Sequence, residues 1–166
     1  MNTTTQGVQF LKELEEECIA TKKCLERIPE NLYEWKPHPK SMHMGYLTLL
    51  VAEIPKWIST MVENSEIDFA TFTHTQPKNT AEMVKHLEDN LQGAKNALEN
   101  VSDEALQEPF YLKANGQIIF STPKNKVIRS TINHLVHHRG QLTVYMRLND
   151  LPVPPLYGPT ADEKNF

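Results

Sequence analysis

The sequence predicts an all-α fold, a four-helix bundle with a small β-hairpin between the third and fourth helices. Three observations favour this class: four apolar stripes with helical spacing, residues between them that end or start helices, and one hairpin turn signal. Each stripe places apolar side chains three or four residues apart, so they share one helix face and leave polar residues opposite. Four such faces bury themselves most simply against one another, as in a four-helix bundle.

Each stripe is about five helical turns long. The stripes run from Leu11 to Ile28, from Met44 to Met61, from Val84 to Val101 and from Ile128 to Tyr145. Pro29 follows the first stripe directly and ends that helix, because proline has no N–H group to donate and its ring clashes with the preceding turn.

Residues outside the stripes predict where helices begin or bend. Asn79 is expected to cap the third helix, with Glu82 as its capping-box partner. Thr122 is expected to cap the fourth helix and Pro123 to be its first residue. Pro55 lies inside the second stripe, where the lost hydrogen bond predicts a kink.

Two further segments lie between or after the helices. A hairpin is expected at about 108–121, because Asn115 and Gly116 between apolar runs favour a type I′ turn. The proline-rich tail, 151–166, is expected to run extended across the bundle. Gly140, inside the fourth helix, costs about 1 kcal/mol relative to alanine, and either a close backbone approach or simple tolerance accounts for it.

Composition limits the possible partners. The chain has 166 residues with a net charge of −4 and interspersed signs, which predicts one domain over 1–166 and opposes binding to nucleic acid or to an anionic membrane. No apolar run exceeds Leu49–Ala52 and no secretory signal is visible, so we expect a cytoplasmic protein. Cys18 and Cys24 are too far apart on one helix for a disulfide.

Three histidines in the fourth helix form the clearest candidate site. His134 and His138 are four residues apart and share a helix face, the spacing at which two imidazoles can bind one metal ion. His137 points about 100° away from His138 and is the weaker candidate. Buried histidines that merely hydrogen-bond a carbonyl or a carboxylate would give the same spacing, so a metal site also needs a third ligand from another helix.

Five longer segments carry a resemblance to a known family. They are Trp35–Met42, Gly45–Trp57, Asn133–Leu142, Tyr145–Leu148 and Pro154–Glu163. Together they resemble the DinB/YfiT-like superfamily over most of the chain. The resemblance implies a four-helix bundle, commonly a homodimer, that binds one divalent metal ion, typically nickel or zinc and less often iron or manganese, through three histidines. It also implies a metal-dependent enzyme, such as a transferase that uses a low-molecular-weight thiol, or a hydrolase, acting on a small molecule.

The resemblance carries over to two of the three ligands. The helix-four ligands match His134 and His138, whereas the helix-two histidine falls at Leu50, which cannot bind a metal. Three outcomes follow: Glu53, one turn later, supplies a carboxylate; two histidines and water hold the ion weakly; or Leu50 fills a lost site. In the last case the chain is a non-catalytic bundle that acts as a dimeric interaction or small-ligand-binding protein.

Several neighbours of the histidines are candidates for the pocket wall or for orienting the ligands. Trp57 shares the side of Leu50 and is either core or pocket, and His137, Arg139 and Gln141 flank the pair. Arg139 and Gln141 either orient the imidazoles or face solvent or a dimer partner. The remaining histidines that we expect at the surface are His38, His74 and His86.

Overall fold

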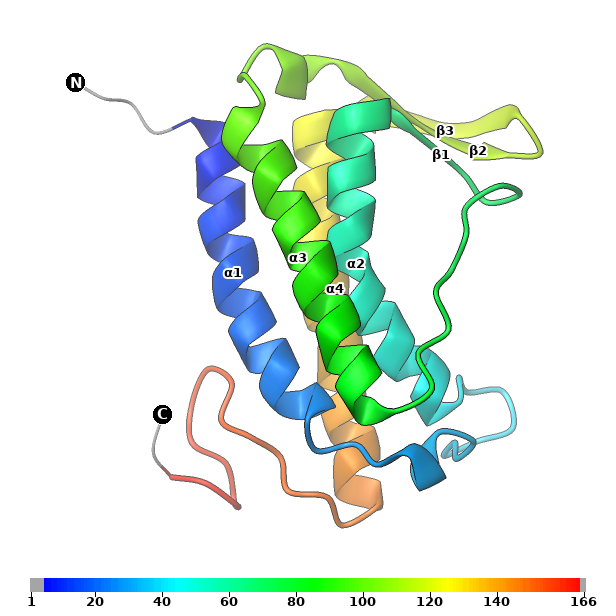
Figure 1. Cartoon of the computed structure of the whole chain (residues 1–166), viewed down its shortest axis with the longest axis vertical. Helices are drawn as coiled ribbons and strands as arrows, with labels where there is room; N and C mark the ends of the chain where they lie inside the picture. The colour runs from blue at the N-terminus through cyan, green and yellow to red at the C-terminus, as the bar shows by residue number, and fades with distance from the viewer. Residues whose placement is uncertain (1–4, 165–166) are drawn as a thin grey trace.

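The computed structural model describes residues 5–164, and four helices dominate it (Figure 1). They are α1 (Gln6–Leu25), α2 (Met44–Asn64), α3 (Thr80–Asn100) and α4 (Lys124–Leu148). Helix α2 packs against α3 and α4, and α1 packs against the same two helices from the other side. The predicted four-helix arrangement is therefore confirmed.

The four stripes form the core of the bundle. Leu14, Leu47, Leu98 and Leu142, one from each helix, are fully buried among the other stripe residues. The α4 stripe is interrupted at His138, which is only half-buried. The interruption marks the place where the inner face of α4 opens into a cavity.

The all-α description is too strict, because the chain also forms a three-stranded sheet. The expected hairpin is present as β2 (Pro109–Ala114) and β3 (Gln117–Pro123), with positive φ angles at Asn115 and Gly116. A third strand, β1 (Glu66–Asp68), pairs in parallel with β2. The sequence gives little sign of β1, since three residues are too few for an alternating pattern to stand out.

The helix starts agree only in part with expectation. The side chain of Asn79 caps α3 and accepts from the backbone N–H of Glu82, as predicted. The fourth helix instead begins at Lys124, with Pro123 in the capping position and no side-chain cap. The prediction for Thr122 was wrong by one residue because Thr122 and Pro123 are still part of β3, which holds them in extended conformation. Helix α2 continues through Pro55.

The tail follows the surface but is not simply extended. The tail reverses direction around Thr160. The N–H of Thr160 donates to the carbonyl of Glu163, and the hydroxyl of Thr160 donates to the carbonyl of Val153. Residues 165 and 166 of the expected tail lie outside the described residues, as do residues 1–4 of the expected domain. Within residues 5–164, no helix combines the length and apolarity that a membrane span requires.

Candidate functional site

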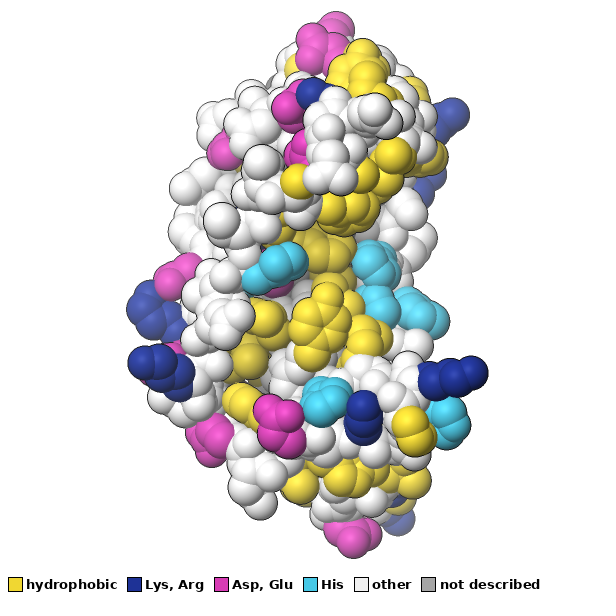
Figure 2. Space-filling model, turned by 90° about the vertical axis from the view of Figure 1, so that its right-hand side faces the viewer, with side chains coloured by type: hydrophobic (Ala, Val, Ile, Leu, Met, Phe, Trp, Pro, Cys, Tyr) yellow, Lys and Arg dark blue, Asp and Glu magenta, His cyan; other side chains and the backbone are white. Residues whose placement is uncertain are grey.

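A mostly apolar cavity of about 500 Å³ lies between α2, α4 and the sheet. We call it the histidine pocket. Figure 2 shows the hollow, with hydrophobic side chains in it and histidines at its sides. The lining residues are Met42, Tyr46, Leu50, Trp57, Met61, Ile67, Phe69, Phe72, His74, Phe110, Leu112, Phe120, Val127, Thr131, His134 and His138. Within residues 5–164, no Lys, Arg, Asp or Glu lines this pocket.

The structure brings His134 and His138 together in the pocket wall. Their Nε2 atoms are 2.6 Å apart, close enough for one to donate to the other. The Nδ1 atom of His138 donates to Oε1 of Gln141 at 2.8 Å, so Nε2 of a neutral His138 is left as an acceptor. His134 therefore donates from Nε2 to His138, and Gln141 orients the pair as expected.

Burial favours the neutral form of His134. Desolvation lowers the pKa of His134, and the nearby charges of His138 and His137 lower it further. His137 itself is exposed, and its ring lies 5.1 Å from that of His138 without entering the pocket wall. His137 thus points away from the pair, as its place on the helix predicts, but its inclusion among the candidates for the pocket wall was wrong.

Leu50 and Trp57 are both part of the pocket wall. The ring of Trp57 lies 5.6 Å from that of His134 and 6.4 Å from that of Phe72. Its Nε1 atom is buried, and no described residue accepts a hydrogen bond from it. Trp57 thus offers the pocket an aromatic face.

The residues present fit a metal ion only in part. Two nitrogens that bind one ion at tetrahedral angles lie roughly 3.4 Å apart, so the two imidazoles must separate from 2.6 Å to admit it. Across residues 5–164, no three His, Cys, Asp or Glu side chains come together in a way that could hold a metal ion. Leu50 lines the cavity in place of a third ligand.

Glu53 belongs to a different cluster from the pair on α4. Its side chain is only 1% exposed, and its Oε2 atom accepts from Nδ1 of His74 at 2.5 Å. Its Oε1 atom lies 3.9 Å from Nε2 of His86. The surface assignment of His86 was wrong, because its side chain is 11% exposed. His38 and His74 are both exposed, as predicted, and His74 is in addition bonded to Glu53.

Arg139 neither touches the histidines nor faces solvent. It is fully buried and turns toward α1, where it pairs with Oε2 of Glu17 at 2.5 Å and donates to the Glu17 carbonyl at 2.8 Å. It also donates to the hydroxyl of Tyr157 in the tail. Arg139 therefore joins α4, α1 and the tail, and the expectation that it orients the imidazoles was wrong.

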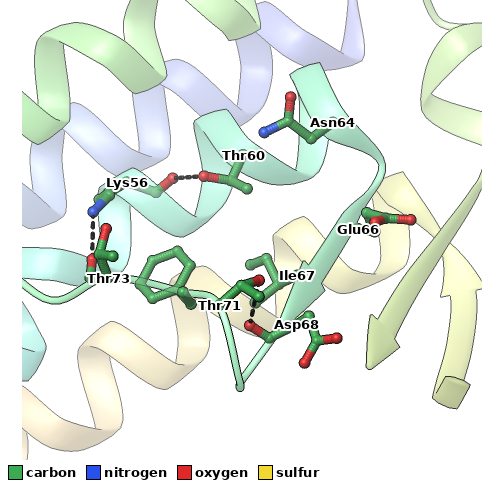
Figure 3. A pocket seen from close by; sticks show the side chains of 9 residues that line it. Lys56, Thr60, Asn64, Glu66, Ile67, Asp68, Thr71 and Thr73 are labelled. Carbon is green, nitrogen blue, oxygen red and sulfur yellow. Dashed lines mark hydrogen bonds between the residues drawn. The ribbon is translucent and has the colours of Figure 1, made fainter. Parts of the chain in front are cut away.

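A second cavity, of about 450 Å³, shares Phe72 with the histidine pocket but has a mostly polar lining (Figure 3). Its charged groups already have partners in the protein. Lys56 donates to the carbonyl of Thr73, Glu66 pairs with Lys113, and Asp68 accepts from three backbone N–H groups. We therefore place the candidate site in the histidine pocket.

Comparison with known proteins now identifies the family. The family model described as "DinB family" matches residues 1–165. The chain belongs to the DinB family. This DinB-family chain is 28% identical over 159 residues to the uncharacterized protein YrdA of Bacillus subtilis, covering 93% of this chain and 89% of that protein.

Crystal structures of DinB-like proteins share the fold. One is YjoA from Bacillus subtilis, with a TM-score of 0.71 and 16% identity, covering 95% of this chain and 99% of that one. Another comes from Bacillus cereus, with a TM-score of 0.67 and 21% identity, covering 89% and 95%. At these identities the comparison shows a common architecture for this DinB-family chain.

Sequence reasoning missed the contributions of the segment between β1 and α3. Phe69, Phe72 and His74 all line the pocket, although this segment has no helical or alternating pattern. Two aromatic residues in an otherwise polar loop were the available signal, because a loop exposes large apolar side chains only when they have something to cover.

Proposed function

We propose that this DinB-family chain binds a small, largely apolar molecule in the histidine pocket, with its polar group against His134 and His138. The observation that carries the proposal is the pocket itself. Its volume of about 500 Å³ lies in the range of small-molecule sites, and its wall combines many apolar groups with a few convergent polar ones.

The chemistry of the wall restricts the ligand. Because no charged side chain other than histidine lines the pocket within the described residues, a ligand with a permanent charge would lose its hydration without gaining an ion pair. The aromatic rings of Trp57 and Phe72 favour a flat, apolar body. A neutral aromatic molecule with one or two hydrogen-bonding groups matches this wall.

A fluorescence titration with the neutral aromatic probe N-phenyl-1-naphthylamine tests the proposal. We expect saturable binding by the wild type. Leu50→Trp should weaken binding at least about tenfold, because the larger ring fills the pocket. The control is Ile19→Trp, at an exposed position on α1 outside the pocket. Equal binding by both variants, or no saturable binding by the wild type, would refute the proposal.

A divalent metal ion, nickel or zinc before iron or manganese, is the second candidate ligand. The convergence of two imidazole nitrogens supports it, and so does the lowered pKa of His134, since metal binding requires neutral histidines. With Leu50 in the third position, we propose that the two histidines hold such an ion weakly. A thiol-dependent transfer or a hydrolysis would require that ion as a Lewis acid, so we propose either activity only for a chain that retains metal.

Metal analysis after metal-supplemented expression separates the alternatives. We expect wild type to retain much less than one equivalent and Leu50→His to approach one. Leu49→His is the matched control, since it adds an imidazole on a neighbouring face of the same helix. His134→Ala in the Leu50→His background should remove the ion. A fully loaded wild type would contradict our view that Leu50 weakens the site.

We also propose that the chain is a homodimer. The support is the β3 strand at the edge of the sheet, where Ile118, Ile119 and Phe120 are at least half exposed and no charged residue separates them. Apolar side chains gathered at an exposed edge favour a covering partner. Analytical ultracentrifugation of wild type and of Ile118→Ser/Ile119→Ser should give a dimer and a monomer; a monomeric wild type would contradict this.

A further inference from the structure

The segment 69–78 connects β1 to α3 along the side of the bundle (Figure 1). We call it the strap. It contributes Phe69, Phe72 and His74 to the wall of the histidine pocket, so its position decides how closed the pocket is. From Thr73 through Pro77 the described chain makes no backbone–backbone hydrogen bond. This half of the strap is therefore held by side-chain contacts.

Most of the polar contacts that hold this half of the strap come from α2. Lys56 donates from Nζ to the carbonyl of Thr73 at 2.8 Å, and its ammonium group lies 4.7 Å from the centre of the Phe72 ring. One turn earlier, Glu53 accepts from Nδ1 of His74 at 2.5 Å. The His74 side chain is 48% exposed, whereas that of Glu53 is buried, so the strap reaches inward to a fixed carboxylate.

The buried carboxylate depends strongly on His74. Among the described residues, Oε1 of Glu53 has no hydrogen-bond partner, and neither has Nε2 of His86, which is 3.9 Å away. Among the described residues, the bond from His74 is therefore the one hydrogen bond that the Glu53 carboxylate accepts. Leaving a buried carboxylate without any hydrogen bond is costly, and this cost favours the docked position of the strap.

We propose that Glu53 is a positioning residue that latches the strap against the histidine pocket through His74. It controls how fast a ligand enters and leaves, and it does not touch the ligand, because it does not line the pocket. The inference rests on the proposed small-molecule site. It also gives Glu53 a role other than that of a metal ligand.

Two measurements on the full-length protein test the latch. The first is the rate of thermolysin cleavage within the strap of the folded protein, located by mass spectrometry, and the second is stopped-flow association and dissociation of N-phenyl-1-naphthylamine. Glu53→Leu removes the acceptor, whereas Glu53→Gln keeps an oxygen that can accept from His74. Thr48→Val is the control, since Thr48 is a buried polar residue of α2 that bonds only within its own helix.

In Glu53→Leu we expect strap cleavage and both probe rates to rise about tenfold, the change produced by losing one hydrogen bond to a charged group. Glu53→Gln should restore values close to wild type, and Thr48→Val should leave them unchanged. A purely structural role of Glu53 would lower the thermal stability of Glu53→Leu with no selective effect on the strap.

Unchanged strap cleavage in Glu53→Leu, or equal changes in Thr48→Val, would overturn the proposal. If Glu53→Leu does not fold, His74→Ala removes the same bond from its exposed partner and must accelerate strap cleavage. If the wild type binds no probe, the small-molecule site is refuted, and the cleavage rate still decides whether Glu53 latches the strap.

Discussion

Replacing Arg139 should destabilise the protein far more than replacing Arg147, which lies two turns further along the same helix. Arg139 is fully buried and bonds to the side chain and the carbonyl of Glu17 and to the hydroxyl of Tyr157. Arg147 also forms an ion pair at 2.5 Å, with Asp162, but its side chain is 50% exposed. The two arginines thus differ mainly in burial.

The structure sets the size of the expected difference. Removing one partner of a buried ion pair costs about 3–5 kcal/mol. Because the Glu17 side chain keeps 15% exposure, we expect Arg139→Met to cost about 3 kcal/mol, at the low end of that range. Arg147→Met should cost about 0–1 kcal/mol, as is usual for exposed pairs.

Urea unfolding followed by circular dichroism measures both values. For a chain of this length, a loss of about 3 kcal/mol corresponds to a fall in Tm of roughly 6–12 °C. If the free energies of unfolding of Arg139→Met and Arg147→Met agree within about 1 kcal/mol, then burial does not govern the strength of these pairs and our reasoning is wrong.

Three further predictions concern two glycines and the thiols. An added Cβ at Gly7 would lie 2.3 Å from the carbonyl oxygen of Leu98, so Gly7→Ala should lose about 1–3 kcal/mol in urea unfolding. A Cβ added at Gly140 would meet no heavy atom of another part of the described chain within 4 Å, so Gly140→Ala should gain about 1 kcal/mol of stability. A loss of stability would indicate that another chain approaches this position. Burial raises the pKa of Cys18 to about 12 and of Cys24 to about 11. Both thiols should therefore resist Ellman's reagent at pH 8 until guanidinium unfolds the chain, and rapid labelling of the native protein would contradict this.

Much of the bundle could be predicted because helical periodicity is local. The stripe of α2 identified a run of buried residues from Met44 to Met61, and the cap at Asn79 located the start of α3. The parallel pairing of β1 with β2 could not be predicted in this way. It joins Ile67 to Leu112 across the whole of α3, and no short-range pattern specifies such a contact.

In the candidate site, too, contacts within one helix could be predicted and contacts between distant segments could not. The approach of His134 to His138 follows from their spacing on one helix, and so does the contact between His138 and Gln141. The partners of Glu53 and Arg139 come from distant segments, a loop and a tail without periodicity. For such residues the sequence shows the chemical group but not which part of the folded chain will meet it.

The parallel strand pair has a consequence for the order of folding. Strands β1 and β2 are separated in the sequence by the whole of α3, and pairings between distant parts of a chain form more slowly than local ones. Phe110 and Leu112 belong to the local β2–β3 hairpin, whereas Ile67 is placed in the cavity wall by the distant pairing. A bundle with four docked helices and an unpaired β1 would lack Ile67 in that wall. A complete cavity therefore requires the β1–β2 pairing as well as the four docked helices.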